Sequence, residues 1–135
     1  MKPKKIKRKY TKKSITKKLQ TKAGNLWKDY CKLRDRVCQL CGGRKVLQVH
    51  HVFSRKNKGL FLDVDNGILL CRVCHCRVTW DDAWKETLRR VVVLKKTQAT
   101  YDRLYEQSLD KTPFLEWKNI AWLESQITIF KEMLK

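Results

Sequence analysis

The sequence predicts an α+β fold: a small zinc-stapled core of strands and a helix, flanked by an N-terminal helix and a helical C-terminal extension. Two Cys-x2-Cys pairs, Cys38/Cys41 and Cys71/Cys74, bracket a segment rich in strand formers and turn residues. Apolar residues recur at helical spacing on both sides of that segment. With 135 residues, the chain has the length of one domain with a tail.

The net charge is the strongest bulk signal, at +19 from 32 Lys and Arg against 13 Asp and Glu. It indicates a polyanionic partner, nucleic acid before an acidic membrane surface. The alternative, charge kept for solubility, is weaker because acidic residues serve solubility better. No apolar run reaches membrane-spanning length, and the basic start is not followed by a signal-peptide core. We therefore expect a soluble cytoplasmic protein with no membrane partner.

Residues 1–23 are expected to form a disordered basic arm. Residues 1–22 hold eleven Lys and Arg residues and no acid, with too little apolar surface to offset the entropy of ordering. Such an arm can lie along a phosphate backbone. Its candidate contacts to nucleic acid are Lys4, Lys5, Lys7, Arg8 and Lys9.

The core is expected over residues 24–80 and begins with a helix over 24–37, for which Asn25 is a plausible N-cap. Cys31 lies close to the apolar stripe of this helix and is expected to be a small buried hydrophobe. The stripe consists of Leu26, Trp27, Tyr30, Leu33 and Val37.

A strand and a turn follow the first cysteine pair. The segment KVLQVHHV, residues 45–52, is rich in strand formers. The Asp-Asn-Gly sequence at 65–67 predicts a turn inside an apolar piece. Asp63 and Asp65 are expected to form and cap turns, although either could add a carboxylate to a metal.

Residues 81–135 are expected to form the helical extension. Trp84, Leu88, Val91 and Val92 repeat at three to four residues. Pro113 is expected to start a last helix capped by Thr112, with an apolar face that ends at Leu134. These stripes are typical of packing and indicate no chemistry.

The two cysteine pairs predict a structural zinc site. Each Cys-x2-Cys turn aims two sulfurs at one point, and four thiolates fill the tetrahedron of Zn²⁺ and leave no open position. The alternative is four reduced cysteines without metal. Cys76 does not have the spacing of a second ligand pair and is expected to be a bystander. The interval between Cys41 and Cys71 is long, so zinc closes a loop that contains further chemistry.

That loop holds His50, His51 and Asn66, and His75 comes directly after the second cysteine pair. Adjacent residues on a strand point to opposite faces, so the two neighbouring histidines cannot easily share one task. One can bind a metal while the other faces a reacting water. The alternative is that the histidines are ordinary core or surface residues and that Asn66 is a plain turn residue.

The motifs VHHV, DNGILLC and CRVCH, with the two cysteine pairs, resemble the zinc-stapled branch of the HNH endonuclease family over roughly residues 36–80. Asn66 lies 15 residues after His51, and His75 lies nine after Asn66. The resemblance implies a ββα-metal core, with His51 as the general base and Asn66 orienting its loop. It implies that His50 and His75 hold the catalytic divalent metal.

The resemblance also implies hydrolysis of phosphodiester bonds in DNA. Imidazole ligands are accepted by Mn²⁺, Ni²⁺ and Zn²⁺, whereas Mg²⁺ prefers oxygen, and the sequence does not choose among these four. The candidate contacts to the substrate near the site are Arg55, Lys56, Lys58, Arg72 and Arg77.

The main alternative function is a non-catalytic zinc module that binds nucleic acid, which needs neither His51 nor Asn66. A structural zinc protein that binds a protein partner through its tryptophan-rich helices gives no reason for the charge. Size and resemblance suggest a phage-type recombination nuclease, which would act in the host cytoplasm. Cutting of both strands by one site per chain would favour a homodimer.

Overall fold

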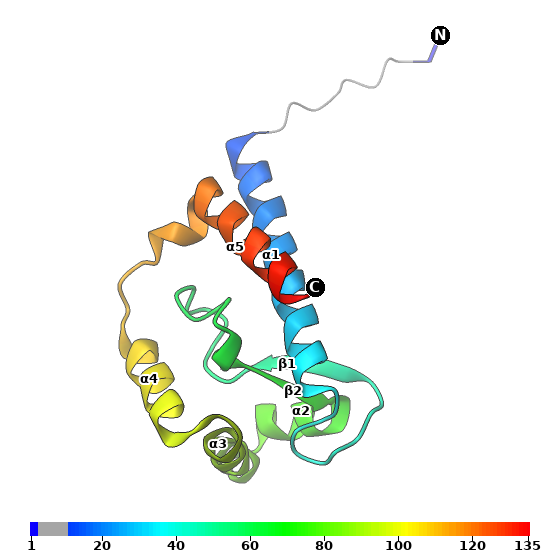
Figure 1. Cartoon of the computed structure of the whole chain (residues 1–135), viewed down its shortest axis with the longest axis vertical. Coiled ribbons are helices and arrows are strands. Elements are labelled where there is room, and N and C mark those ends of the chain that lie inside the picture. Colours follow the sequence, from blue (N-terminus) through cyan, green and yellow to red (C-terminus); the bar gives the residue numbers. More distant parts are fainter. Residues whose placement is uncertain (3–10) are drawn as a thin grey trace.

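The computed structural model describes residues 1–2 and 11–135 of the chain. Its centre is a two-stranded antiparallel sheet followed directly by a helix, the ββα arrangement that the sequence predicts. Longer helices lie on either side of this centre, and the loop after the first strand runs between them (Figure 1). In the part described, no helix is both long and apolar enough to cross a membrane.

Helix α1 (Lys12–Asp35) begins well before the expected start, because Thr11 rather than Asn25 caps it by accepting from the Ser14 N–H. Residues 12–23 are therefore helical, and the expectation of disorder is wrong for them. Tertiary packing stabilises the helical conformation of these residues. Helix α5 (Ile120–Met133) lies along α1, and Ala23 is fully buried in one core cluster with Ile127 and Phe130 of α5 (Figure 1). The remaining arm residues, 3–10 with Lys4, Lys5, Lys7, Arg8 and Lys9, lie outside the described residues.

Strands β1 (Leu47–His51) and β2 (Gly67–Cys71) pair so that Leu47 faces Cys71 and His51 faces Gly67. The first four residues of β2 are buried, as expected for a strand between α1 on one side and helix α2 (Arg72–Trp80) on the other. A short 3-10 turn, η1 (Val64–Asn66), leads into β2 and realises the predicted Asp-Asn-Gly turn.

Gly67 permits the close approach of α1 to the sheet. A Cβ at this position would lie 2.6 Å from Cys31 Sγ and 2.7 Å from Trp27 Cζ2, closer than real Cβ contacts. The glycine of the Asp-Asn-Gly sequence is thus required by packing as well as by the turn. Asp35, at the end of α1, accepts from the Leu69 N–H at 2.9 Å and fixes the helix to the strand.

The C-terminal extension consists of helices α3 (Asp82–Lys96) and α4 (Gln98–Leu109), a 3-10 turn η2 (Leu115–Lys118) and α5. Leu88 and Val92 of α3 pack on Val78 of α2 in a core cluster around the sheet, as their spacing predicts. The prediction of a helix start at Pro113 is wrong. Asn119 caps α5 by accepting from the Trp122 N–H, and the segment before it is taken up by η2.

Candidate functional site

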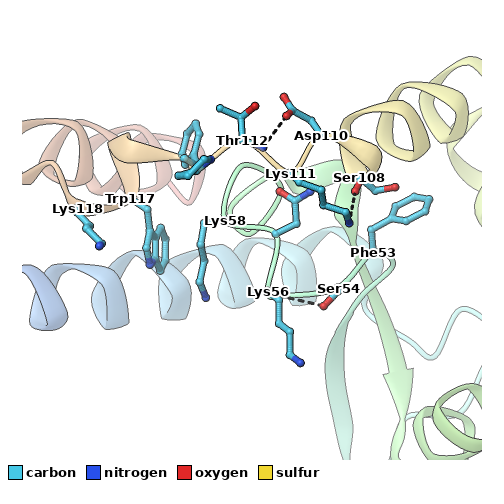
Figure 2. Close-up of a pocket in the computed structure, with 13 residues that line it drawn as sticks. Phe53, Ser54, Lys56, Lys58, Ser108, Asp110, Lys111, Thr112, Trp117 and Lys118 are labelled. Carbon is cyan, nitrogen blue, oxygen red and sulfur yellow. Dashed lines mark hydrogen bonds between the residues drawn. The ribbon is translucent and has the colours of Figure 1, made fainter.

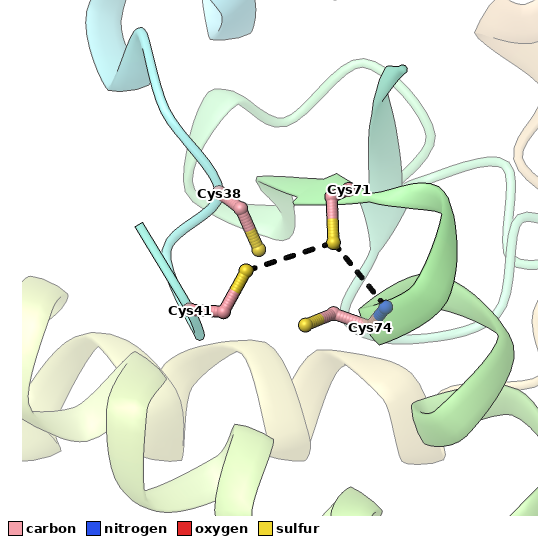
Figure 3. Close-up of side chains that lie close together, drawn as sticks. All are labelled: Cys38, Cys41, Cys71 and Cys74. Carbon is pink, nitrogen blue, oxygen red and sulfur yellow. Dashed lines mark hydrogen bonds between the residues drawn. The ribbon is translucent and has the colours of Figure 1, made fainter. Parts of the chain in front are cut away.

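Four cysteines converge at the base of the ββα core, as predicted (Figure 3). Cys38 and Cys41 come from the turn after α1, Cys71 ends β2, and Cys74 lies in the first turn of α2. Their sulfur atoms all lie within 4.8 Å of one another. The Sγ atoms of Cys41 and Cys71 are 3.7 Å apart. Tetrahedral Zn²⁺ with bonds of about 2.3 Å needs a sulfur–sulfur spacing of about 3.8 Å, so the donor set and the spacing fit zinc.

The other two cysteines stand apart from this cluster. Cys31 is fully buried against Trp27, and burial, opposed in part by Arg34, raises the pKa of its thiol to about 11. It packs as the small hydrophobe that its position predicts. Cys76 is exposed on α2 and lies outside the four-sulfur group, which agrees with its expected role as a bystander.

The neighbouring histidines of β1 face different partners. The imidazole of His50 meets that of His75 from α2, with ring centroids 5.0 Å apart and planes at 82°. Burial, with some contribution from the charges of His75 and His51, lowers the pKa of His50 to about 4. His50 is therefore neutral near pH 7, and one of its ring nitrogens keeps a lone pair that can bind a cation. Two adjacent imidazoles fit a divalent metal that accepts nitrogen ligands and retains open positions.

His51 lies on the other side of the strand, against α1. Its ring stacks on the indole of Trp27 with centroids 4.3 Å apart and an interplanar angle of 13°. Its Nε2 lies 3.0 Å from the carbonyl oxygen of Phe61. A carbonyl can only accept, so Nε2 carries the hydrogen and Nδ1 keeps a free lone pair.

Burial lowers the pKa of His51 despite the hydrogen bond to Phe61, and the charges of Lys28, Arg55 and Lys58 lower it further. Three cations thus approach one neutral imidazole from α1 and from the loop after β1. Such a concentration of positive charge suits a phosphate diester beside the ring.

Asn66 is fully buried and is hydrogen-bonded to the loop that follows His51. Its Oδ1 accepts from the Phe53 N–H at 2.8 Å, and its Nδ2 donates to the carbonyls of Phe53 at 3.2 Å and Leu60 at 3.1 Å. One amide therefore ties both ends of the loop 53–60. The next residue, Phe61, supplies the carbonyl that holds the His51 ring. The geometry supports the expected role of Asn66 in orienting this loop.

Two further residues, which the sequence analysis did not assign to the site, help to hold His51 and the η1 turn in place. Trp27 donates from Nε1 to the carbonyl of Asp63 at 2.9 Å, which fixes the indole under His51. Arg103 of α4 pairs with Asp63 at 2.8 Å and with Asp65 at 2.9 Å. The side chain of Asp63 also caps η1, as expected, by accepting from the Asp65 N–H. Spacing places Trp27 on a core stripe, but only tertiary structure brings it to His51.

A pocket of about 620 Å³ opens beside the histidines. Helix α2 contributes Val78 and Thr79 to its wall, and the C-terminal extension contributes Lys85, Leu88, Arg89 and Tyr101. Its remaining lining residues are His50, His51, Val52 and Ser54. The extension therefore shapes the pocket together with the ββα core.

The predicted basic contacts do not all lie near the histidines. Arg55 and Lys58 lie near His51, whose pKa they lower, and Lys58 places its ammonium 4.6 Å from the centre of the Phe61 ring. Lys56, in the same loop, lines a different pocket from the histidines. Arg72 lines a pocket with residues 43–46, and the Arg77 guanidinium lies over the Trp84 ring, 4.8 Å from its centre. Neither of these two arginines lines the histidine pocket, so their contact with nucleic acid stays a prediction.

Comparison with known proteins agrees with this geometry. Residues 38–79 match the family model described as HNH endonuclease. The match begins at the first cysteine of the cluster and includes the sheet, Asn66 and most of α2. No curated protein and no solved structure matches the chain. The similarity to the HNH endonuclease family is therefore confined to residues 38–79, which hold the four-cysteine cluster and nearly all of the ββα core.

Proposed function

We propose that this protein is a metal-dependent endonuclease that hydrolyses phosphodiester bonds in DNA. In this proposal His51 is the general base, and His50 and His75 hold the catalytic divalent metal. The observation that carries it is the division of the two adjacent histidines: one meets His75, whereas the other is held by Trp27 and the Phe61 carbonyl. A module that only binds nucleic acid has no need of this arrangement.

The proton path follows from the tautomer of His51. Its Nδ1 accepts a proton from the attacking water, while the Nε2 hydrogen stays with the Phe61 carbonyl. That carbonyl also stabilises the imidazolium that forms. Because burial lowers the pKa of His51, the ring is neutral and ready to accept a proton near pH 7.

The two imidazoles of His50 and His75 would hold Mg²⁺, Mn²⁺, Ni²⁺ or Zn²⁺. When bound, such an ion supplies positive charge to the phosphate and to the departing oxygen. Arg55 and Lys58 contribute further charge near the phosphate, and Asn66 keeps their loop in place.

The four-sulfur cluster serves the fold, since four thiolates leave zinc no position for substrate. It joins the turn before β1 to the start of α2, the helix that carries His75. Reduced thiols suit an intracellular compartment, so we place the protein in the cytoplasm. One chain holds one histidine site, and cutting of both strands would take a homodimer or two events.

The test is cleavage of supercoiled plasmid by the purified zinc-loaded chain, with each of the four divalent ions supplied in turn. We expect nicked or linear product with at least one ion, and none when His51→Ala replaces the wild type. Plasmid that stays supercoiled with every ion, although the protein binds DNA, would favour the non-catalytic zinc module.

A further inference from the structure

A second pocket, also of about 620 Å³, lies between the loop after β1 and residues 108–118, which comprise the end of α4 and most of the linker to α5 (Figure 2). Phe53, Ser54 and Lys56 form one side of it. Phe114 and Trp117 form part of the other. This pocket contains none of the histidines, and the proposed chemistry does not use it.

The charge of this pocket is strongly positive. Lys56, Lys58, Lys111 and Lys118 line it, against the single carboxylate of Asp110. Within residues 11–135 none of the four ammonium groups is in an ion pair with a carboxylate. The Asp110 carboxylate accepts from the Thr112 N–H, which lowers its pKa and engages it locally. The pocket therefore suits a ligand rich in phosphate.

The aromatic residues in the lining limit the class of ligand further. The ammonium of Lys58 lies 5.2 Å from the Trp117 ring centre, so charge and π-surface stand together (Figure 2). Phe53 and Phe114 add two more rings. Recognition of a duplex backbone needs cations alone, whereas lysines interleaved with aromatic rings are typical of sites for unpaired nucleotides.

The pocket adjoins the histidine pocket. Ser54 lines both pockets, next to Phe53, whose backbone N–H and carbonyl are both held by the buried Asn66. The ridge between the two pockets is thus fixed. A strand with a phosphate at His51 would pass Ser54 and reach the lysines and aromatic rings.

We propose that this pocket binds unpaired nucleotides of the DNA strand that is cut, next to the scissile phosphate. The inference rests on the proposed function for its position relative to the cut. The substrate class that follows is DNA with a single-stranded stretch beside the cleavage site. Phe114 provides a stacking surface, and Lys111 and Lys118 contact the phosphates.

The experiment measures binding of fluorescein-labelled oligothymidine of about 20 nucleotides, and of a duplex of the same length, by anisotropy without added divalent metal. Phe114→Leu keeps an apolar side chain but removes the ring. We expect it to weaken oligothymidine binding about tenfold and to leave duplex binding nearly unchanged. Lys111→Ala/Lys118→Ala should weaken oligothymidine more than duplex, whereas the matched pair Lys131→Ala/Lys135→Ala, at the C-terminal end of the chain, should weaken both equally.

Equal affinity changes for the two ligands in Phe114→Leu would overturn the proposal. If the far-ultraviolet circular dichroism spectrum shows that Phe114→Leu is unfolded, the test uses the Lys111→Ala/Lys118→Ala variant instead. The ratio of its affinities for oligothymidine and duplex then decides. The proposed function is judged separately. If His51→Ala stops cleavage while Phe114→Leu binds both ligands as the wild type does, the assignment of this pocket fails and the nuclease stands.

Discussion

The indole of Trp27 stacks face to face on the imidazole of His51, with ring centroids 4.3 Å apart. The Nε1 hydrogen of Trp27 is held by the Asp63 carbonyl, and His51 is held by the Phe61 carbonyl. The proposed base is therefore fixed by a residue of α1 that lies outside the segment matched by the family model. The N-terminal helix therefore contributes to the proposed site as well as to the fold.

Trp27→Phe should slow cleavage while leaving DNA affinity unchanged. Phenylalanine keeps an aromatic face but loses the hydrogen bond to Asp63, so His51 gains freedom to turn away from the water. A displacement of this kind can reduce kcat by about 10–100-fold with little change in KM. Trp122→Phe is the control and should keep its kcat, because Trp122 packs against the same core cluster but meets the Phe114 ring edge to face and does not stack on His51. Equal losses of kcat in the two variants would show that Trp27 contributes only to packing and does not position His51.

Gly67→Ala should destabilise the fold strongly. The new Cβ would lie 2.6 Å from Cys31 Sγ and 2.7 Å from Trp27, so α1 must shift away from β2. Overpacking of this kind typically costs about 1–3 kcal/mol. Gly59→Ala finds no contact shorter than 3.4 Å and should change the free energy of unfolding by less than about 1 kcal/mol. Thermal or denaturant unfolding of the two variants measures this difference. A melting temperature of Gly67→Ala equal to that of the wild type would contradict the prediction.

Cys38→Ser should unfold the ββα core and release zinc. A small domain draws much of its folding free energy from such a site, because the ligands are assembled only in the folded chain. Elemental analysis should find one Zn²⁺ per wild-type chain. Cys76→Ser removes an exposed thiol outside the cluster and should retain both zinc and fold. Freshly purified, folded wild-type protein without zinc would contradict the assignment.

Deletion of residues 1–10 should weaken DNA binding and flatten its salt dependence. It removes six Lys and Arg residues but keeps Thr11, the cap of α1. The slope of log K against log salt should fall by about 0.9 for each phosphate that the shortened protein no longer neutralises. Deletion through residue 22 should in addition lower the melting temperature, because it removes the buried Thr16 and the first turns of α1. An unchanged salt slope after the shorter deletion would mean that residues 1–10 do not contact the phosphate backbone of DNA.

The sequence predicts well what depends on local spacing. The Cys-x2-Cys pairs specify the cluster, and the alternation of a strand specifies that His50 and His51 point to opposite faces. It predicts poorly what depends on distant partners. Residues 12–23 resemble a disordered arm until α5 covers Ala23, and Pro113 resembles a helix start until η2 and the Asn119 cap take its place. Likewise, nothing local places Arg103 on Asp63.

Single-turnover nicking of supercoiled DNA, beside calorimetric titration of the catalytic metal, tests the division of the histidines most directly. His51→Ala should lose about 10²–10⁴ in rate yet bind metal as the wild type does, because its ring contacts Trp27 and Phe61 and not the His50–His75 pair. His75→Ala should lose the catalytic metal and keep the structural zinc. If His51→Ala nicks DNA at the wild-type rate, the assignment of His51 as the base is wrong and the nuclease account fails with it.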